Sequence, residues 1–445
     1  MRQSRAVPLT ALDAGGISRC LAQLADRPGD RVDAFFEVVE ETRYCPDGDA
    51  PRLRRRSEAG LAVRLARGRR CWLTSSDRID AEAFRDAVGR TARVRPAAWS
   101  MPAGLAVGMG AAGPGAAADG VDLEPLPELL REAIRRRHAA FPMRIEAFRR
   151  RRWVRVAGPV LAPEQEREEL LGLVVRTPWG RWGGLFPGLE EGVVEEAALA
   201  LLARFSAREA EPPPAGRAHL VLGPAAAAVL LHEAVAHALE ADRPLRAPAV
   251  AAGSRLGAAC LSVIDDPTGA PAAVRRETDD EAVPVVRRWL LRDGVVEQLL
   301  ADLAHAAESE ELLPGAARRS SRHRPPVPRS HHLEVTPGES SDEDLLSAAP
   351  GGLFVAEAEA GRLDPEAGRF VLEVPCARRI GAGGLEGPVG RFRLVGSVAE
   401  VLGSVAAVGR DVRPAAAGWC AKGGERLAVW ATAATLLLED VEVSA

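Results

Sequence analysis

The sequence of 445 residues contains almost no lysine and no asparagine. Of its 58 basic residues only Lys422 is a lysine, which leaves 57 arginines. A coding bias towards arginine explains this composition wherever a position accepts either residue. A lysine that persists against such a bias indicates a place that needs a compact ammonium group rather than the planar guanidinium of arginine. Chance survival of a single lysine is the alternative.

Paired cysteines and long apolar runs are also missing. The six cysteines are scattered singly and form no CxxC pair, so we expect no disulfide framework and a reducing, cytoplasmic location. Residues 1–16 contain no apolar run, so no secretory signal is expected. The longest apolar stretch, Ala225–Ala241, is interrupted by His232, Glu233 and His237, and we expect no membrane span.

The chain carries little excess charge of either sign. With 62 acidic and 58 basic residues the net charge is −4, which argues against nucleic acid as a direct partner. The cluster Arg149–Arg152 beside Trp153 is the main exception. Because the surrounding residues alternate as a strand does, the cluster is more typical of the solvated face of a sheet than of a nucleic-acid patch.

Length and apolar periodicity predict an α+β fold with two lobes. At roughly 150 residues per domain the chain suffices for two or three domains. We expect a mixed α/β N-terminal lobe over residues 1–115, a middle segment 116–212 that continues it, and a strand-rich C-terminal domain over residues 213–445. The Gly-, Ala- and Pro-rich stretch Met101–Gly120 is interpreted as a connection. Strands are predicted at 32–40, 60–65 and 149–156, and helices at 79–92, 127–139 and 192–207.

The most informative stretch runs from Ala218 to Asp242. A short strand, Ala218–Leu222, is followed by Gly223-Pro224 and a predicted helix over Ala225–Glu240 that crosses the C-terminal lobe. This helix carries His232, Glu233 and His237 in an HExxxH arrangement. A five-residue step rotates an ideal helix by roughly 140°, so both imidazoles reach one metal only if the turn between them is widened, as in a π-turn. The alternative is a buried helix with two ordinary histidines.

The segment LLHEAVAHALEAD resembles the signature helix of the TldD/PmbA family, with consensus close to LHExxGHxLExD. Further resemblances follow in the order of the family and are more specific in the C-terminal half. They lie at Arg55–Leu65, Leu261–Thr268, Thr278–Pro284, Ala317–Arg329, Gly361–Asp364 with Gly368–Phe370, and Gly418–Glu425.

The resemblance implies a zinc ion (Zn²⁺) held by His232, His237 and Cys420, with Glu233 as the catalytic carboxylate. Two imidazoles and one thiolate leave a fourth position open for water, which is the layout of a catalytic zinc site. The implied function is the hydrolysis of peptides or unfolded protein segments. Four other residues are candidates for supporting roles: Lys422 beside the thiolate or the oxyanion, Glu240 and Asp242 in the same motif, and Asp280.

The resemblance also implies partners. A paralogous TldE/PmbA-type subunit that lacks the zinc motif is expected, or a self-dimer, and an extended substrate would be held by added-strand hydrogen bonding. The alternative function is a non-catalytic or regulatory subunit with a structural metal, in a role like that of a gyrase modulator. The chain departs from the family pattern where alanine replaces glycine, at Ala236, Ala238, Ala241 and Ala421, and also at His332 and Glu425.

Overall fold

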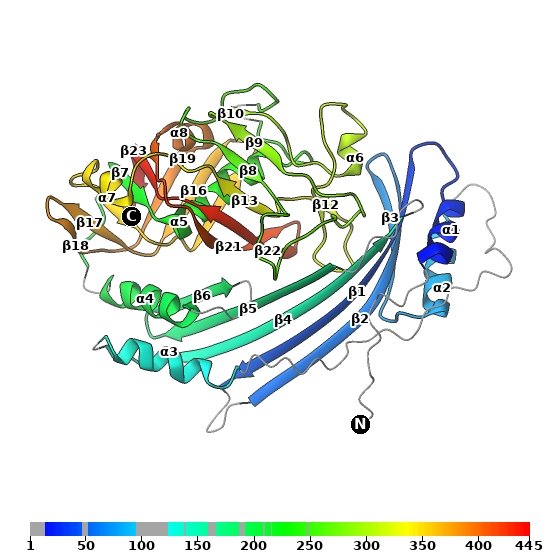
Figure 1. Cartoon of the computed structure of the whole chain (residues 1–445), viewed down its shortest axis with the longest axis horizontal. Helices are drawn as coiled ribbons and strands as arrows, with labels where there is room; N and C mark the ends of the chain where they lie inside the picture. The colour runs from blue at the N-terminus through cyan, green and yellow to red at the C-terminus, as the bar shows by residue number, and fades with distance from the viewer. Residues whose placement is uncertain are drawn as a thin grey trace.

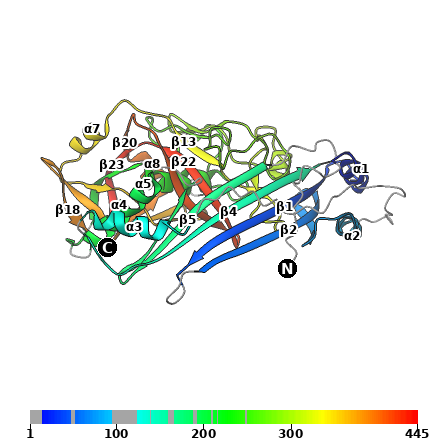
Figure 2. The ribbon, with the colours of Figure 1, turned by 60° about the horizontal axis from the view of Figure 1, so that its bottom comes forward.

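The computed structural model describes residues 14–46, 52–94, 123–137, 139–158, 166–186, 192–207, 210–214, 216–246 and 249–445. The fold is α+β, as predicted: a long N-terminal sheet lies beneath a C-terminal part built from further sheets (Figures 1 and 2). The predicted connection at Met101–Gly120 lies outside the described residues. The domain boundaries at 115 and 212 stay predictions.

The N-terminal sheet is entirely antiparallel, with the strand order β3-β2-β1-β4-β5-β6. Helices α1 and α2 pack against one end of it, and α3 and α4 against the other. The elements are β1 (Asp30–Cys45), β2 (Arg52–Arg67), β3 (Arg70–Ser76), β4 (Arg144–Ala157), β5 (Glu166–Thr177), β6 (Gly180–Phe186), α1 (Ala14–Leu24), α2 (Ala81–Ala92), α3 (Leu126–Arg135) and α4 (Val193–Ser206).

Both faces of this sheet carry buried side chains, and successive side chains of a strand point to opposite faces. In β1, Phe36 packs against Phe84 of α2 with ring centroids 6.3 Å apart. Its neighbour Phe35 belongs instead to an apolar cluster that includes Ala282 of the C-terminal part. The alternation therefore joins the helices to one face and the C-terminal part to the other.

The arginine cluster of β4 corrects the sequence interpretation. Arg149 and Arg152 are buried, so the cluster is not a solvated face. Arg152 donates to Glu37 Oε1 at 2.8 Å and to the carbonyl of Arg319, in the C-terminal part, at 3.0 Å. Arg152 therefore lies between the N-terminal sheet and the C-terminal part, whereas Arg149 pairs with Glu169 of the neighbouring strand β5.

The C-terminal part contains two large sheets with the orders β10-β9-β8-β13-β22-β21 and β15-β16-β19-β23-β7-β14-β17-β18, with β20 paired to β23. A hairpin of β11 and β12 and three short helices complete it. The strands of the first sheet and the hairpin are β8 (Val263–Asp265), β9 (Arg288–Arg292), β10 (Val295–Val296), β11 (Ala317–Arg318), β12 (Val327–Pro328), β13 (His332–Val335), β21 (Arg413–Lys422) and β22 (Glu425–Ala433). The second sheet and the helices are β7 (Gly216–Leu222), β14 (Leu353–Val355), β15 (Ala360–Asp364), β16 (Arg369–Val374), β17 (Ala377–Gly381), β18 (Gly384–Val389), β19 (Phe392–Ser397), β20 (Val405–Val408), β23 (Leu436–Ser444), α6 (Leu303–Ala306), α7 (Asp342–Ser347) and α8 (Val398–Gly403).

Helix α5 (Pro224–Leu231) is the centre of the C-terminal core. It starts with proline at its first position, where no backbone donor is lost, and every residue from Ala226 to Leu231 is buried. The predicted helix over Ala225–Glu240 is wrong in its second half. The chain widens into a π-turn over His232–Ala236 and then tightens into a 3-10 turn over His237–Leu239. None of the described helices has the length and apolar character needed to cross a membrane.

Candidate metal centre

The π-turn after α5 provides the widened turn that two histidines five residues apart require. The backbone N–H of His237 donates to the carbonyl of His232, one residue further back than in an α-helix. The two imidazole rings consequently lie near each other, with centroids 4.6 Å apart and planes inclined at 65°. The turn therefore presents both rings on one side of the chain.

The third member of the cluster comes from strand β21. Cys420 Sγ lies 3.3 Å from His237 Nε2. One potential ligand atom each from His232, His237 and Cys420 can be chosen so that all lie within 4.8 Å of one another. Within the described part of the chain, this is the one cluster of three or more His, Cys, Asp or Glu side chains arranged so.

His232 supplies the observation that tests whether a metal fits. The residue is 3% exposed, and neither Nδ1 nor Nε2 has a hydrogen-bond partner among the described residues. Burial lowers the pKa of this imidazole well below its ordinary value, so the ring is neutral and carries a free lone pair. An unsatisfied buried polar group is costly, and a metal bond would satisfy it. Two imidazoles and a thiolate are the donors that zinc prefers.

His237 is oriented by the carboxylate of Glu240. Its Nδ1 lies 3.0 Å from Glu240 Oε2, which leaves Nε2 facing Cys420. Burial opposes charge on both groups, but their attraction wins: the pKa of His237 is raised well above its ordinary value and that of Glu240 falls to about 2. A carboxylate in this position fixes the orientation of a ligating imidazole.

Lys422 binds carboxylates rather than the sulfur. Its Nζ donates to Glu240 Oε2 at 2.8 Å, to Asp242 Oδ1 at 2.7 Å and to the carbonyl of Pro328 at 3.3 Å. This compact ammonium thus joins two candidate supporting residues to the turn. Of the two roles expected for Lys422, beside the thiolate or beside the oxyanion, these contacts do not include the first, and the second stays a prediction.

Arg329 is the cation beside the sulfur, and sequence reasoning did not single it out. Its Nη1 lies 2.9 Å from Cys420 Sγ, and its Nη2 donates to the carbonyl of Lys422 at 2.9 Å. The side chain is 1% exposed. The available signal was its position as the last residue of the family-like segment Ala317–Arg329.

Glu233 lies at the wall of a cavity of about 400 Å³ that is also lined by His237, Glu240, Trp419 and Gly361. It is half-buried, and burial raises the pKa of its carboxyl group. Gly361 of β15 approaches so closely that a methyl group there would overlap the Glu233 side chain. Glycine is therefore the residue that leaves room for this carboxylate.

Asp280 belongs to a different region. Its Oδ1 accepts from Arg276 at 2.8 Å and its Oδ2 from the backbone of Arg319 at 2.7 Å. Arg319 in turn contacts Asp33 of β1 at 3.1 Å. The contacts of Asp280 thus lie at the junction with the N-terminal sheet and not among the side chains of the metal cluster.

The chain is similar to known proteins over its C-terminal part. Residues 215–445 match the family model of the PmbA/TldA metallopeptidase C-terminal domain. A metalloprotease TldD homologue of Buchnera aphidicola subsp. Schizaphis graminum is 29% identical over 253 residues, 56% of this chain and 52% of the relative. A zinc metalloprotease TldD homologue of Saccharolobus solfataricus is 22% identical over 219 residues, 49% of each chain. This chain therefore spans about half the length of the curated relatives it matches.

Two crystal structures share the fold over nearly the full length. TldE from Thermococcus kodakarensis superimposes with a TM-score of 0.72 at 17% identity, covering 97% of this chain and 99% of that one. A candidate modulator of a DNA gyrase from Thermotoga maritima superimposes with a TM-score of 0.70 at 17% identity. The match covers 94% of this chain and 96% of that one. At these identities the likeness concerns the fold, whereas the family model matches just over half of the chain directly. The chain therefore belongs to the TldD/PmbA family of metallopeptidases.

Proposed function

We propose that this chain is a zinc-dependent peptidase that cleaves peptides or unfolded protein segments. The observation that carries the proposal is the convergence of His232, His237 and Cys420, together with a cavity that both His237 and the adjacent carboxylate-bearing residue Glu233 line. Relatives named as metalloproteases, one of them as a zinc metalloprotease, support it.

The three clustered side chains would hold the zinc ion. When bound there, zinc supplies Lewis-acid chemistry, which polarises a peptide carbonyl and makes a water molecule more acidic. Glu240 orients His237 through the 3.0 Å contact, and Arg329 offsets negative charge at the sulfur of Cys420. These two partners act by positioning and by charge rather than by touching the substrate.

Glu233 would carry the proton during hydrolysis. Its carboxylate accepts a proton from the attacking water and later delivers it to the nitrogen of the departing amine. Because burial raises its pKa, the group is a stronger base than an exposed glutamate. Gly361 leaves the space that this side chain occupies, because any larger residue at position 361 would overlap it.

The substrate would bind as an extended strand. Both large sheets of the C-terminal part end beside the candidate site, one at β21 and the other at β15, and residues of both strands line its cavity. In the described residues each of these strands pairs on one side only, so backbone donors and acceptors remain available. Hydrogen bonding of this kind recognises the backbone of the substrate and depends on few of its side chains, which suits unfolded substrates.

We further propose that the chain works in the cytoplasm, either with a TldE-type subunit of the same fold or as a self-dimer. The full-length similarity to the TldE fold supports the first arrangement.

The deciding experiment combines metal content with cleavage. We expect the purified chain to retain zinc, measured by inductively coupled plasma mass spectrometry, and to degrade fluorescently labelled unfolded casein in a chelator-sensitive way. Zinc without such cleavage, in the presence and absence of a TldE-type partner, would support the non-catalytic alternative instead.

A further inference from the structure

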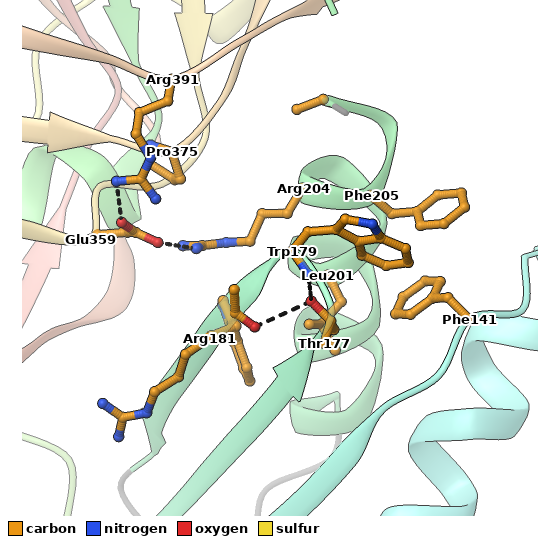
Figure 3. Close-up of a pocket in the computed structure, with 13 residues that line it drawn as sticks. Phe141, Thr177, Trp179, Arg181, Leu201, Arg204, Phe205, Glu359, Pro375 and Arg391 are labelled. Atoms are coloured by element: carbon orange, nitrogen blue, oxygen red, sulfur yellow. Dashed lines mark hydrogen bonds and ion pairs between the residues drawn. The ribbon is translucent and has the colours of Figure 1, made fainter. Parts of the chain in front are cut away.

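Several guanidinium groups of this protein pair with carboxylates. In the cavity beside α4, Arg204 and Arg391 each pair with one oxygen of Glu359 (Figure 3). At the junction with the N-terminal sheet, the fully buried Arg319 pairs with Asp33 at 3.1 Å. Such pairing offsets part of the cost of taking a charge out of water. A buried arginine that lacks a carboxylate partner is therefore informative about its other neighbours.

Arg329 is such an arginine. It is 1% exposed and forms no ion pair with a carboxylate among the described residues. Its Nη1 lies 2.9 Å from Cys420 Sγ and 3.5 Å from the carbonyl oxygen of Cys420, and its Nη2 donates to the carbonyl of Lys422 at 2.9 Å. Both carbonyls are neutral, whereas the guanidinium group stays charged. Within the described part of the chain, the sulfur is thus the one hydrogen-bonding neighbour of Arg329 that can carry a negative charge.

Backbone contacts on two sides hold Arg329 in this position. The residue follows Pro328, which pairs with Ala317 across the hairpin of β11 and β12. Its backbone N–H donates to the carbonyl of Ala316 at 2.9 Å. The hydrogen bond to the carbonyl of Lys422 fixes the guanidinium group against β21, two residues beyond the sulfur. The hairpin and β21 therefore place the cation, and its position does not depend on the sulfur alone.

We propose that Arg329 is the counter-ion of the sulfur of Cys420 and sets how strongly this sulfur donates electrons to the metal. The inference rests on the proposed function, because it takes Cys420 to be a zinc ligand. A charge-assisted hydrogen bond to a thiolate withdraws electron density from the sulfur, so zinc bound there would remain a stronger Lewis acid. Since Arg329 acts through Cys420, it is a positioning residue and not a catalytic one.

Cobalt(II), bound in place of zinc, tests this role without relying on turnover. The charge-transfer band from sulfur to cobalt in the near ultraviolet reports the electron density on the sulfur, and Cys420→Ser identifies the band by its loss. Arg329→Met, Arg329→Gln and Arg329→Lys are compared with the unaltered chain. The matched control is Arg318→Met. Arg318 is buried in the same hairpin, but its guanidinium group binds backbone carbonyls, those of Ser330 at 2.7 Å and Ala428 at 3.0 Å.

We expect the band to move to longer wavelength in Arg329→Met, because the lone pairs of the sulfur rise in energy when the cation is lost. Arg329→Gln, which lacks the charge, should shift in the same direction, and Arg329→Lys, which keeps it, should stay closest to the unaltered chain. Arg318→Met should leave the band in place. Casein cleavage by Arg329→Met should fall about tenfold although zinc is retained.

An unchanged band in the Met and Gln variants would overturn the inference. So would an equal shift in Arg318→Met, because loss of any buried guanidinium group from the hairpin would then suffice. Loss of both metals from Arg329→Met would make its role structural. If that variant does not fold, the difference between Arg329→Gln and Arg329→Lys decides in the same way.

The same experiment separates this inference from the proposed function. A cobalt-loaded unaltered chain without a sulfur band would overturn both, because Cys420 would then not be a ligand. Casein cleavage by the unaltered chain is measured in parallel. Its absence beside the expected band shifts contradicts the peptidase proposal alone, whereas cleavage without those shifts contradicts the role of Arg329 alone.

Discussion

Cys420 depends on side chains that are far from it in sequence. His237 Nε2 lies 3.3 Å from its sulfur and Arg329 Nη1 lies 2.9 Å from it, so an imidazole and a guanidinium group both face the same atom. Cys420 itself is 2% exposed. Under the proposed function this sulfur is a metal ligand rather than a side chain that only packs.

Replacement of the sulfur should release the metal. We expect Cys420→Ser to retain zinc at least about tenfold more weakly, because loss of a ligand should exceed the effect of losing a group that only orients one. Zinc content after dialysis against a graded chelator is the measurement. Cys260→Ser, at an exposed cysteine, is the control and should behave as the unaltered chain. Unchanged metal content in Cys420→Ser would show that the third ligand is misassigned.

Glu233 is expected to affect turnover without affecting metal content. Glu233→Gln preserves the size of the side chain but removes the proton acceptor, so peptide cleavage should fall by about 10²–10⁴-fold while zinc is retained. Casein cleavage and zinc content are measured on the same sample. Exposed Glu343→Gln serves as the control. A parallel loss of zinc would mean that the carboxylate is itself a ligand.

At the scale of elements, the site depends on a π-turn and on a strand that passes close to it. The π-turn brings His237 alongside His232, and strand β15 passes close to Glu233 at Gly361. Neither feature is independent of the core, since the residues of α5 that precede the turn are buried between the sheets. The geometry of the turn is therefore held by packing rather than by the local sequence.

The close approach of β15 can be tested with a methyl group. Gly361→Ala should displace Glu233, reduce cleavage strongly and cost about 1–3 kcal/mol in the free energy of unfolding. Cleavage assays and urea unfolding followed by circular dichroism give the two quantities. Gly387→Ala in β18 is the matched control, because a methyl group there meets nothing within 4 Å. Full cleavage activity in Gly361→Ala would contradict the role given to this contact.

At the scale of the whole molecule, a buried network of ion pairs joins the N-terminal sheet to the C-terminal part. Arg64 of β2 pairs with Asp33 at 2.6 Å and with Glu281 at 2.6 Å, while Arg319 reaches Asp33 at 3.1 Å. Glu37 of β1 accepts from Arg152 at 2.8 Å. Removing one member of such a pair leaves a buried charge without compensation.

Acid should therefore loosen this junction. Burial works to raise the pKa of Glu37, but Arg152 and the backbone N–H of Arg322 outweigh it, and the pKa in the folded protein lies below the ordinary 4.5. The stabilisation is complete above about pH 4.5 and is lost as the pH falls towards the folded value, since the unfolded state then binds more protons. We expect the melting temperature, followed by calorimetry, to drop between pH 7 and pH 3.

Glu37→Gln checks the origin of that drop. At neutral pH the variant should lose about 3–5 kcal/mol of stability, because Arg152 remains buried without its partner. Its melting temperature should also depend less on pH than that of the unaltered chain. Glu343→Gln, at an exposed position, should keep the full pH dependence. An unchanged pH dependence in Glu37→Gln would place the acid-sensitive groups elsewhere.

Much of the fold was predictable from local patterns. The strands predicted at 32–40 and 60–65 lie within β1 and β2, and the helix predicted at 192–207 is α4. Their apolar residues recur with the period of a strand or of a helix, so the sequence alone predicts them. The helix predicted at 127–139 ends earlier, at Arg135. The HExxxH spacing also predicted that the turn had to widen if both rings were to meet, and it does.

By itself, then, the sequence determined the α+β class, the positions of most elements and the residues able to bind a metal. The tertiary structure alone decided which of those residues meet. It brings Cys420 to the two histidines, places Arg329 rather than Lys422 against the sulfur, and buries Arg152 between the N-terminal sheet and the C-terminal part. The reason is physical. The apolar period of a segment reflects which of its faces is buried. The contact between His237 and Cys420, residues nearly two hundred positions apart, depends instead on how complete sheets pack around a buried helix.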